Sequence, residues 1–315
     1  MRRRRLLLTA AIALGLAPGT WWRTHMPADP PQEMTVTPVD HDSGLPDGWR
    51  LAGLWEIESR AIQFGGFSAL VPVTGTKLQA WSDRGWSLEF AAPQAGRMDM
   101  RFAPQAVESD FGLRVLDIES ATRHVRTGRT WLGFEFEHAL HRIAADGTPD
   151  GVRDLTGEVE WPANAGAEGL VRLEDGRFLL FPERANEALI FRGDPVEGAE
   201  FTAFRVEWPR EDYAVTDAAL LPDGRVLLLM RDLAWATPPF STFLAVGDPG
   251  DIAPGGVWKP EELLDLDAVL PRENYEGLAV ILAPGDVVDI WLISDDNFSA
   301  FQRTLVAKLE WGGRQ

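Results

Sequence analysis

The sequence predicts an all-β protein: a β-propeller of five or six blades of about 50 residues each, with the ring closed by an N-terminal strand. Three observations predict it. Beyond residue 50 there is little helical periodicity, with one short helix candidate at residues 259–270. Short apolar runs are separated by Gly, Pro and Asp, which is typical of chains of short strands. These runs also recur as hairpins at a nearly constant interval.

Five hairpin turns can be placed by a glycine between two apolar runs. The turn glycines are Gly75, Gly128, Gly176, Gly224 and Gly285. Asp175-Gly176 and Asp223-Gly224 are the clearest, because Asp-Gly is a preferred pair in two-residue hairpins. The five glycines lie 53, 48, 48 and 61 residues apart. A unit of this length that opens with a hairpin indicates a propeller blade. The longest interval leaves room for a sixth, degenerate blade, and a two-sheet sandwich is the alternative fold.

Closure of the ring is expected from the segment "GWRLAGLWEIESR", residues 48–60, which could supply an outer strand to the last blade. Residues 49–315 are therefore expected to form a single β-propeller domain. The thirteen tryptophans should mostly fill the space between blades, where strands are buried on both faces. Trp235 and Trp258 are the candidates for stacking on a sugar.

The N-terminus predicts export. Arg2 to Arg5 precede an apolar stretch at 6–17, which ends in Gly15-Leu16-Ala17, a small-x-small pattern suited to signal cleavage. About 12 apolar residues are too few to span a bilayer. We expect a Sec or twin-arginine signal at residues 1–17 and a periplasmic or secreted protein, the alternatives being an uncleaved anchor or a misplaced start. Residues 18–48 read as a Pro-rich linker.

Charge and cysteine content narrow the partners. The formal net charge is −18 and cysteine is absent, so nucleic acid and anionic membranes are disfavoured as partners, and disulfides and thiolate chemistry are excluded. The surface suits cations, or an anionic substrate that cations or arginines screen. We expect a monomer that binds a small-molecule substrate and has no membrane span in its mature part.

Acidic residues cluster at the open ends of the hairpins. In a tight hairpin, residues equidistant from the turn face each other. The expected pairs are Ser68–Asp83, Glu168–Glu183, Asp217–Met230 and Glu276–Asp295, with Glu119 opposite or diagonal to Glu135. In a propeller all these open ends emerge on one face around the axis, so we expect an acidic mouth there. The candidate metal ligands are Asp83, Glu119, Glu168, Glu183, Glu276, Asp295 and Asp296.

The negative charge of such a mouth must be compensated. Two like charges about 4 Å apart repel by about 4 kcal/mol at an effective dielectric constant near 20. Protons, arginines or a hard cation must therefore offset the carboxylates. Oxygen ligands without Cys or paired His favour Ca²⁺, with Mg²⁺ as the alternative, over zinc. The candidate substrate-binding residues are Arg84, Arg184, Arg231 and Asn297; salt bridges between blades are the other interpretation of the arginines.

Several segments resemble a known family. They are "SDDNFSAFQRTLVAKLEW" (294–311), "NYEGLA" (274–279), "GFSALVPVTGTKLQAWSDRG" (66–85), "AEGLVRLEDGRFLLFPER" (167–184) and "VTDAALLPDGRVLLLMRD" (215–232). They look like the bacterial proteins called "esterase-like activity of phytase", over residues 50 to 311. The resemblance implies an exported β-propeller with phytase-like or phosphoesterase activity. Calcium-dependent propeller phytases, more distant relatives, hold several Ca²⁺ ions with acidic side chains, and the ions bind substrate phosphates.

These observations predict an exported phytase-like hydrolase, a divalent-cation-dependent phosphoesterase that acts at the acidic mouth. Two alternatives remain open: a metal-dependent lactonase-like hydrolase, and a non-catalytic periplasmic binding or scaffold propeller with structural calcium. A serine hydrolase is disfavoured, because "GFSAL" (66–70) lacks the last glycine of the G-x-S-x-G elbow and lies in a strand setting.

Overall fold

The computed structural model describes residues 33–92, 98–104, 117–135, 138–162, 166–183, 186–233, 238–253 and 255–312. The predicted export signal, the first part of the predicted linker, Arg184 and Trp235 lie outside these residues. Within the described part, strands account for the regular structure, together with three short 3₁₀ turns, Pro195–Glu197, Pro249–Asp251 and Leu266–Ala268. No helix in the described ranges has the length and apolar character that crossing a bilayer would require.

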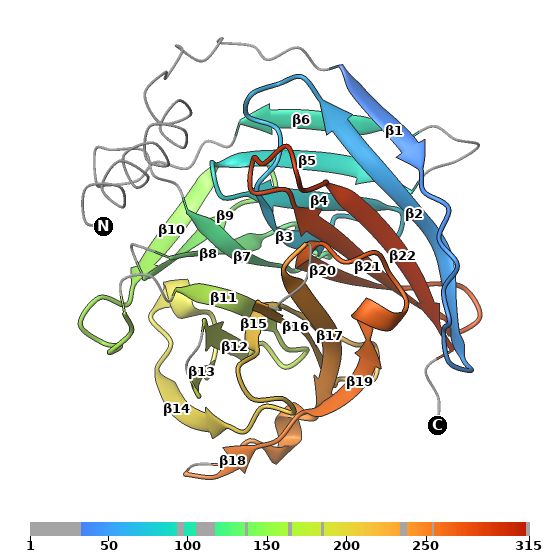
Figure 1. Ribbon diagram of the computed structural model, residues 1–315. Helices are drawn as coiled ribbons and strands as arrows, with labels where there is room; N and C mark the ends of the chain where they lie inside the picture. The colour runs from blue at the N-terminus through green and yellow to red at the C-terminus, as the bar shows by residue number, and fades with distance from the viewer. Residues whose placement is uncertain are drawn as a thin grey trace, which may run out of the picture. The chain divides into compact units, whose positions relative to one another are not determined.

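Five predominantly antiparallel sheets surround a common axis (Figure 1). The first blade is β3 (Phe67–Pro72), β4 (Lys77–Ser82), β5 (Trp86–Ala91) and β6 (Met100–Pro104). The second is β7 (Ile118–Arg123), β8 (Thr130–Phe134), β9 (Ala139–Ile143) and β10 (Pro149–Asp154). The third is β11 (Ala167–Arg172), β12 (Phe178–Pro182), β13 (Glu187–Phe191) and β14 (Phe201–Val206).

The fourth blade is β15 (Ala214–Leu220), β16 (Val226–Leu233), β17 (Phe240–Gly247) and β19 (Glu261–Asp265), while β18 (Val257–Trp258) joins β14 of the third blade in parallel. The fifth is β20 (Asn274–Leu282), β21 (Val288–Asp295), β22 (Leu305–Trp311), β2 (Trp49–Ser59) and β1 (Met34–Pro38). The prediction of a β-propeller is therefore confirmed, with five blades. The long interval after Gly224 is occupied by β17 to β19 rather than by a sixth blade among the described residues.

The ring is closed as expected. β2 pairs with β22, with Trp55 opposite Val306, so an N-terminal strand completes the last blade. β1 extends this sheet by one more strand, with Val36 opposite Ile57. Residues 34–38, which lie in the predicted linker, are therefore part of the sheet.

The helix predicted at 259–270 is wrong. Its first half is β19, which pairs with β17 so that Leu264 lies opposite Leu244, and its second half is the 3₁₀ turn at 266–268. An available sheet edge next to β17 outweighs the local helical preference, because propensity is a weak determinant when a strand can pair and bury its apolar residues.

The hydrophobic core is divided among the five blade interfaces. Each of the five clusters of buried side chains joins residues from two neighbouring blades: Phe67 packs with Trp291 in one cluster, and Trp131 with Leu170 in another. Because each blade is covered on both faces, its middle strands read as continuous apolar runs. Every residue of β21 is buried, for example. This packing holds the innermost strands β3, β7, β11, β15 and β20 around the axis.

Candidate functional site

Each innermost strand carries a β-bulge at the same place, near the start of the strand. The register shift falls at Ser68, Glu119, Glu168, Thr216 and Glu276 in the five blades. A bulge adds one residue that has no partner opposite, and it re-aims that side chain. Four of the five bulged residues, all except Thr216, line a pocket at the axis. The fold thus repeats one local irregularity to point side chains into one place.

The bulges change the predicted cross-strand pairs. Glu168 does not lie opposite Glu183 in the strand register. Instead the backbone amide of Glu183 donates to the carbonyl of Gly166 at 3.2 Å. The amide of Asp83 likewise donates to the carbonyl of Gly66 at 2.8 Å, and Asp295 lies opposite Asn274. Three of the expected pairings were therefore wrong by two residues, and Asp217 lies opposite Leu229 rather than Met230. A regular hairpin register does not anticipate the extra residue of a bulge.

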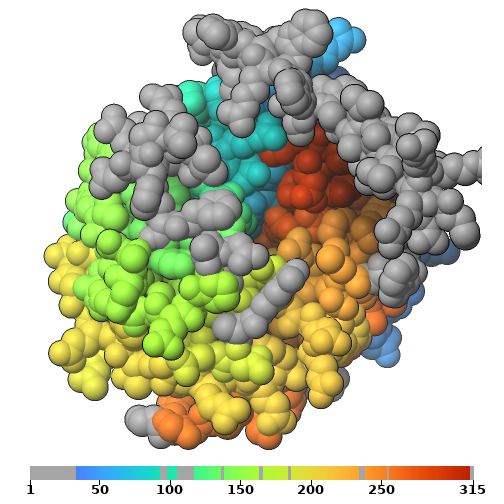
Figure 2. All heavy atoms as spheres, turned by 60° about the vertical axis from the view of Figure 1, so that its left-hand side comes forward, coloured from blue at the N-terminus to red at the C-terminus, as the bar shows by residue number. Residues whose placement is uncertain are grey.

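The ends of the second strands supply a second set of side chains. The equivalent residues are Asp83, Glu135, Glu183, Arg231 and Asp295. Four blades provide a carboxylate there, and the fourth blade provides an arginine. Figure 2 shows one face of the ring, where described segments from several blades meet around a central hollow.

These two sets form the axial pocket, a cavity of about 220 Å³. Its lining residues are Ser68, Asp83, Glu119, Glu135, Glu168, Glu183, Arg231, Glu276, Asp295 and Asn297. Six of the seven predicted metal ligands, and two of the predicted substrate-binding residues, thus come together. Glu135 was expected in the mouth but not as a ligand.

Glycines before the innermost strands leave room for the acidic residues at the ends of the second strands. A Cβ on Gly166 would collide with the backbone and side chain of Glu135 from the preceding blade. Gly66 has φ +65°, which L side chains rarely adopt, and its Cβ would strike the Asp83 carboxylate and Phe298. Glycine at these strand ends is therefore required by close contact, and at Gly66 by backbone conformation as well.

Glu168 is the most exceptional group in the axial pocket. It is only 8% exposed, and no described residue gives its carboxylate a hydrogen bond or a salt bridge. Burial raises its pKa well above the ordinary value, the charges of Glu183 and Glu276 raise it further, and Arg231 partly opposes them. Glu119 behaves in the same way: burial is the main cause of its raised pKa, followed by Glu168 and Glu276.

Three further carboxylates of the pocket, Asp83, Glu135 and Asp295, have raised pKa values. Burial raises the pKa of Asp83 to about 7, although Arg84 opposes the shift. Burial raises the pKa of Glu135 to about 8, helped by a hydrogen bond and repulsion from Asp117. The pKa of Asp295 lies well above its usual value, again through burial first and Glu276 second. At neutral pH this pocket favours either bound protons or a bound cation.

Arg231 is the one cationic side chain among the pocket-lining residues that the structure describes. Its Nη1 donates to Asn274 Oδ1 at 2.6 Å and pairs with Glu276, and its Nη2 lies 3.9 Å from Glu183 Oε1. Burial works against its charge, but Glu276, Glu168 and Glu183 outweigh this and raise the pKa of Arg231. The arginine therefore neutralises the side of the pocket near the fourth and fifth blades.

Two groups of carboxylate oxygens have the spacing of a cation site. One oxygen each from Asp117, Glu119 and Glu135 lie within 4.8 Å of one another, and so do oxygens from Glu135, Glu168 and Glu183. Glu135 belongs to both groups. The sequence prediction missed Asp117; the available signal was its position two residues before the bulged Glu119, equivalent to Gly66 and Gly166 in the neighbouring blades.

Two of the predicted site residues, Asp296 and Arg84, lie outside the axial pocket. Asp296 is absent from the pocket lining, and its carboxylate accepts from Phe298 N at 2.9 Å, Thr304 Oγ1 at 3.2 Å and Gly66 N at 3.3 Å. It therefore stabilises the turn after β21. Arg84 places its guanidinium carbon 3.1 Å from the centre of the Phe298 ring rather than in the pocket.

Asp217 was expected in the mouth, and this was wrong. It is fully buried and accepts from the backbone amides of Leu278 at 2.7 Å, Ala218 at 2.7 Å and Leu70 at 3.4 Å. Because it follows the bulged Thr216, it projects into the protein rather than into the pocket. Asp217 thus ties the innermost strands of the fourth, fifth and first blades together.

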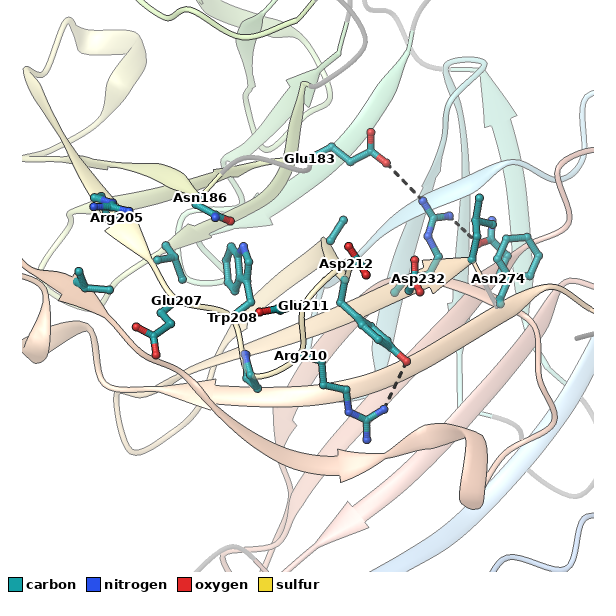
Figure 3. Close-up of a pocket in the computed structure, with 18 of the residues that line it drawn as sticks. Glu183, Asn186, Arg205, Glu207, Trp208, Arg210, Glu211, Asp212, Asp232 and Asn274 are labelled. Carbon is teal, nitrogen blue, oxygen red and sulfur yellow. Dashed lines mark hydrogen bonds and ion pairs between the residues drawn. The ribbon is translucent and has the colours of Figure 1, made fainter. Parts of the chain in front are cut away.

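A groove of about 1730 Å³ adjoins the axial pocket (Figure 3). It is lined by residues 205–214 and 231–233, and by Glu183, Asn186, Phe240, Val257, Asn274, Asn297 and Gln302. Glu183, Arg231 and Asn297 line both cavities. Trp208 lies in this groove, whereas Trp258, the predicted sugar-stacking residue, is only 2% exposed and stacks on Phe181 in the core.

Fold and site together define a class: a five-bladed β-propeller with an acidic pocket on its axis. A family model described as "Phytase-like: Esterase-like activity of phytase" matches residues 62–298, a span that contains all five bulges and the whole axial pocket. The chain belongs to this family, as its resemblance in sequence implied. No curated protein matches the chain in a sequence comparison.

The solved structures to which this chain is similar are distant in sequence. An endo-arabinase from Bacteroides thetaiotaomicron has a TM-score of 0.50 at 10% identity, covering 78% of this chain and 94% of that one. The WD40 β-propeller domain of Doa1 has a TM-score of 0.44 at 11% identity, with coverages of 84% and 97%. Hydrazine synthase of Kuenenia stuttgartiensis has a TM-score of 0.40 at 10% identity; the match covers 75% of this chain and 58% of that chain. At such identities the similarity concerns the fold alone.

Proposed function

We propose that this protein is an exported hydrolase that cleaves a phosphate ester in the axial pocket with the help of a divalent cation. The observation that carries the proposal is Glu168, a buried carboxylate that faces other acids and has no hydrogen-bond or salt-bridge partner among the described residues. A buried negative charge without compensation is costly, so it calls for a ligand of opposite charge.

The oxygen spacing fits Ca²⁺. Calcium binds oxygens at about 2.3–2.6 Å, so two ligands on opposite sides of the ion lie about 5 Å apart. Within each of the two groups the oxygens lie within 4.8 Å of one another, which falls inside this limit. Mg²⁺ needs about 2.1 Å and a stricter octahedron, and is the alternative. An ion would be held by Asp117, Glu119 and Glu135, or by Glu135, Glu168 and Glu183.

A phosphate-bearing substrate is favoured by the positive charges that a bound cation and Arg231 would provide in the pocket. A phosphate group would be repelled by the carboxylates alone. A bound cation supplies the positive charge that attracts the phosphate and polarises its oxygens. Arg231 lines the same pocket and presents a planar guanidinium suited to phosphate oxygens, and Asn297 lies at the pocket edge.

Proton transfer can be assigned within the first blade. Hydrolysis forms a bond from a water oxygen to phosphorus and breaks the ester P–O bond; the water releases one proton to solvent, and the leaving oxygen takes up one. Asp83 lies outside both oxygen groups, lines the pocket, and has a pKa of about 7. A group with a pKa near the working pH is well suited to donate that proton.

The experiment is an activity panel with a matched pair of variants. The mature protein is assayed on p-nitrophenyl phosphate, phytate and a set of lactones, with Ca²⁺, with Mg²⁺ and with EDTA. We expect phosphatase activity that EDTA abolishes and Ca²⁺ restores. Glu168→Gln should lower it by about 100-fold or more. Glu174→Gln, at the exposed turn of the same hairpin, should leave it unchanged.

Two other results would replace the proposal. Lactone cleavage without phosphatase activity would make the protein a metal-dependent lactonase-like hydrolase. A lower melting temperature in EDTA, with no hydrolysis on either panel, would indicate a binding or scaffold propeller with structural calcium.

A further inference from the structure

The groove next to the axial pocket is too large for a small phosphate ester. Its volume of about 1730 Å³ exceeds the roughly 300–1,000 Å³ of ordinary small-molecule sites. In Figure 3 it extends from Glu183 and Asn274 at one end, past Trp208, to Arg205 at the other. An elongated ligand is needed to fill it.

The groove has aromatic and amide side chains. Trp208 and Tyr213 are half-buried and line it, and Trp208 also packs against Phe181, with ring centres 6.2 Å apart. Asn186 and Gln302 bring amides, which both donate and accept hydrogen bonds. Trp208 thus offers an apolar face surrounded by groups that bond to hydroxyls.

The charges of the groove disfavour polyanionic and apolar ligands. Glu211 and Asp212 are exposed and have no salt bridge or hydrogen bond through their side chains among the described residues. Arg210 is already committed to Glu262 at 2.6 Å and to Asp265 at 3.0 Å. A polyanion would therefore be repelled, and an apolar chain would strip water from unpaired carboxylates. A neutral, hydroxyl-rich ligand satisfies both constraints.

The walls are held in place before any ligand arrives. Arg210 also donates to the Tyr213 hydroxyl at 3.4 Å, and that hydroxyl bonds to Ser241 Oγ at 2.7 Å. The segment from 208 to 213 is thereby anchored to β17 and β19 of the fourth blade. A rigid wall lowers the entropy cost of binding a flexible ligand.

We propose that this groove binds a neutral oligosaccharide chain, with one sugar ring stacked on Trp208. Because Glu183, Arg231 and Asn297 line both cavities, a chain bound here reaches the axial pocket with its end. This part of the inference rests on the proposed function: the phosphate ester that is cleaved is carried by the terminal sugar of that chain.

The test measures binding separately from hydrolysis. The mature protein, in EDTA, is titrated calorimetrically with neutral gluco-, xylo-, manno- and arabino-oligosaccharides of four to six units. We expect at least one series to bind, with affinity increasing with chain length. Trp208→Ala should weaken that binding about tenfold or more, and Glu211→Gln, a mild change at an exposed site, should weaken it severalfold. Trp161→Ala serves as the control, because Trp161 is also half-buried but contacts His138 outside the groove.

Absence of binding by every series at about 10 mM, or equal losses in Trp208→Ala and Trp161→Ala, would overturn the inference. The two proposals fail separately. EDTA removes any cation, so saccharide binding is measured whether or not the axial pocket hydrolyses phosphate esters. Conversely, phosphatase activity without saccharide binding would leave the proposed function intact and remove only this inference.

Discussion

The guanidinium of Arg231 lies 3.9 Å from the carboxylate of Glu183, in the position where the other four blades each place an acid. The fourth blade therefore breaks the fivefold pattern with a positive charge. Because Arg231 also pairs with Glu276 and bonds to Asn274, it neutralises one side of the axial pocket. Glu168 of the third blade has no side-chain hydrogen bond or salt bridge among the residues described, and this carboxylate and Glu119 of the second blade belong to the oxygen groups in which we place the cation.

Removing Arg231 should destabilise the protein strongly. Arg231→Met would leave Glu276 and Glu183 buried without their counter-charge, and losing one partner of a buried ion pair costs about 3–5 kcal/mol. The free energy of unfolding is measured by urea denaturation in EDTA. Arg192→Met is the matched control, because Arg192 is 76% exposed and pairs weakly with Glu200 at 3.8 Å; its change should stay within about 0.5 kcal/mol. Equal effects of the two substitutions would contradict this role of Arg231.

Calcium should stabilise the folded protein through Glu168. A ligand that binds only the native state at about 100 times its Kd adds about 2.7 kcal/mol to the free energy of unfolding. We therefore expect the melting temperature to rise with Ca²⁺ concentration and to fall back in EDTA. Glu168→Gln should lose most of this calcium-dependent rise, and Glu174→Gln should keep it. A calcium response that survives in Glu168→Gln would place the ion elsewhere.

Without a cation, stability should decrease as pH rises. The pKa of Asp83 is raised to about 7 and that of Glu135 to about 8 by burial, whereas both groups ionise near pH 4 in the unfolded chain. Between about pH 4 and pH 8 the native state thus holds more protons than the unfolded state, so the free energy of unfolding falls over this range.

This pH dependence is measured as the melting temperature from pH 5 to pH 9 in EDTA. Asp83→Asn, which cannot ionise, should reduce the slope. Saturating Ca²⁺ should also reduce it, because the cation stabilises the ionised carboxylates. A melting temperature that rises with pH in EDTA would show that these acids are not the ones that control stability.

Asp217 should be a major determinant of stability although it lies outside the site. Asp217→Ala removes the acceptor for three buried amides, those of Leu70, Ala218 and Leu278. Each unsatisfied buried group costs about 1–3 kcal/mol, so we expect a loss of about 3 kcal/mol or more in urea denaturation. Asp217→Asn keeps one carbonyl oxygen and should lose less. Asp223→Ala, at an exposed turn, is the control, and a loss as large as that of Asp217→Ala would contradict the prediction.

Much of the propeller could be predicted from local chemistry. The turn glycines at a nearly constant interval indicated the blades, and the apolar run at 49–59 indicated the closing strand; both rest on interactions between residues close in sequence or on simple strand patterning. The edge strands were harder to predict from the sequence. β19 resembled a helix start, and β1 lay in a Pro-rich stretch, because only the presence of a sheet edge made these residues strands.

The acidic mouth was predicted, but its internal arrangement was not. Regular alternation from each turn placed Asp217 among the mouth acids and Glu168 opposite Glu183. One extra residue in each innermost strand changes which side chains face the axis, and a bulge depends on contacts with neighbouring blades that a single hairpin does not contain. The same reason explains why Asp296, predicted as a ligand, instead bonds to Gly66 from another blade.

By itself, the sequence determined that the chain folds into repeated hairpins around an axis and that acids stand at their open ends, because turn residues and strand periodicity act over a few positions. Only the tertiary structure decided which acids share the pocket, where Arg231 compensates them, and that separate segments build a groove beside them. Those outcomes depend on distances between blades, which arise when the buried faces pack against one another.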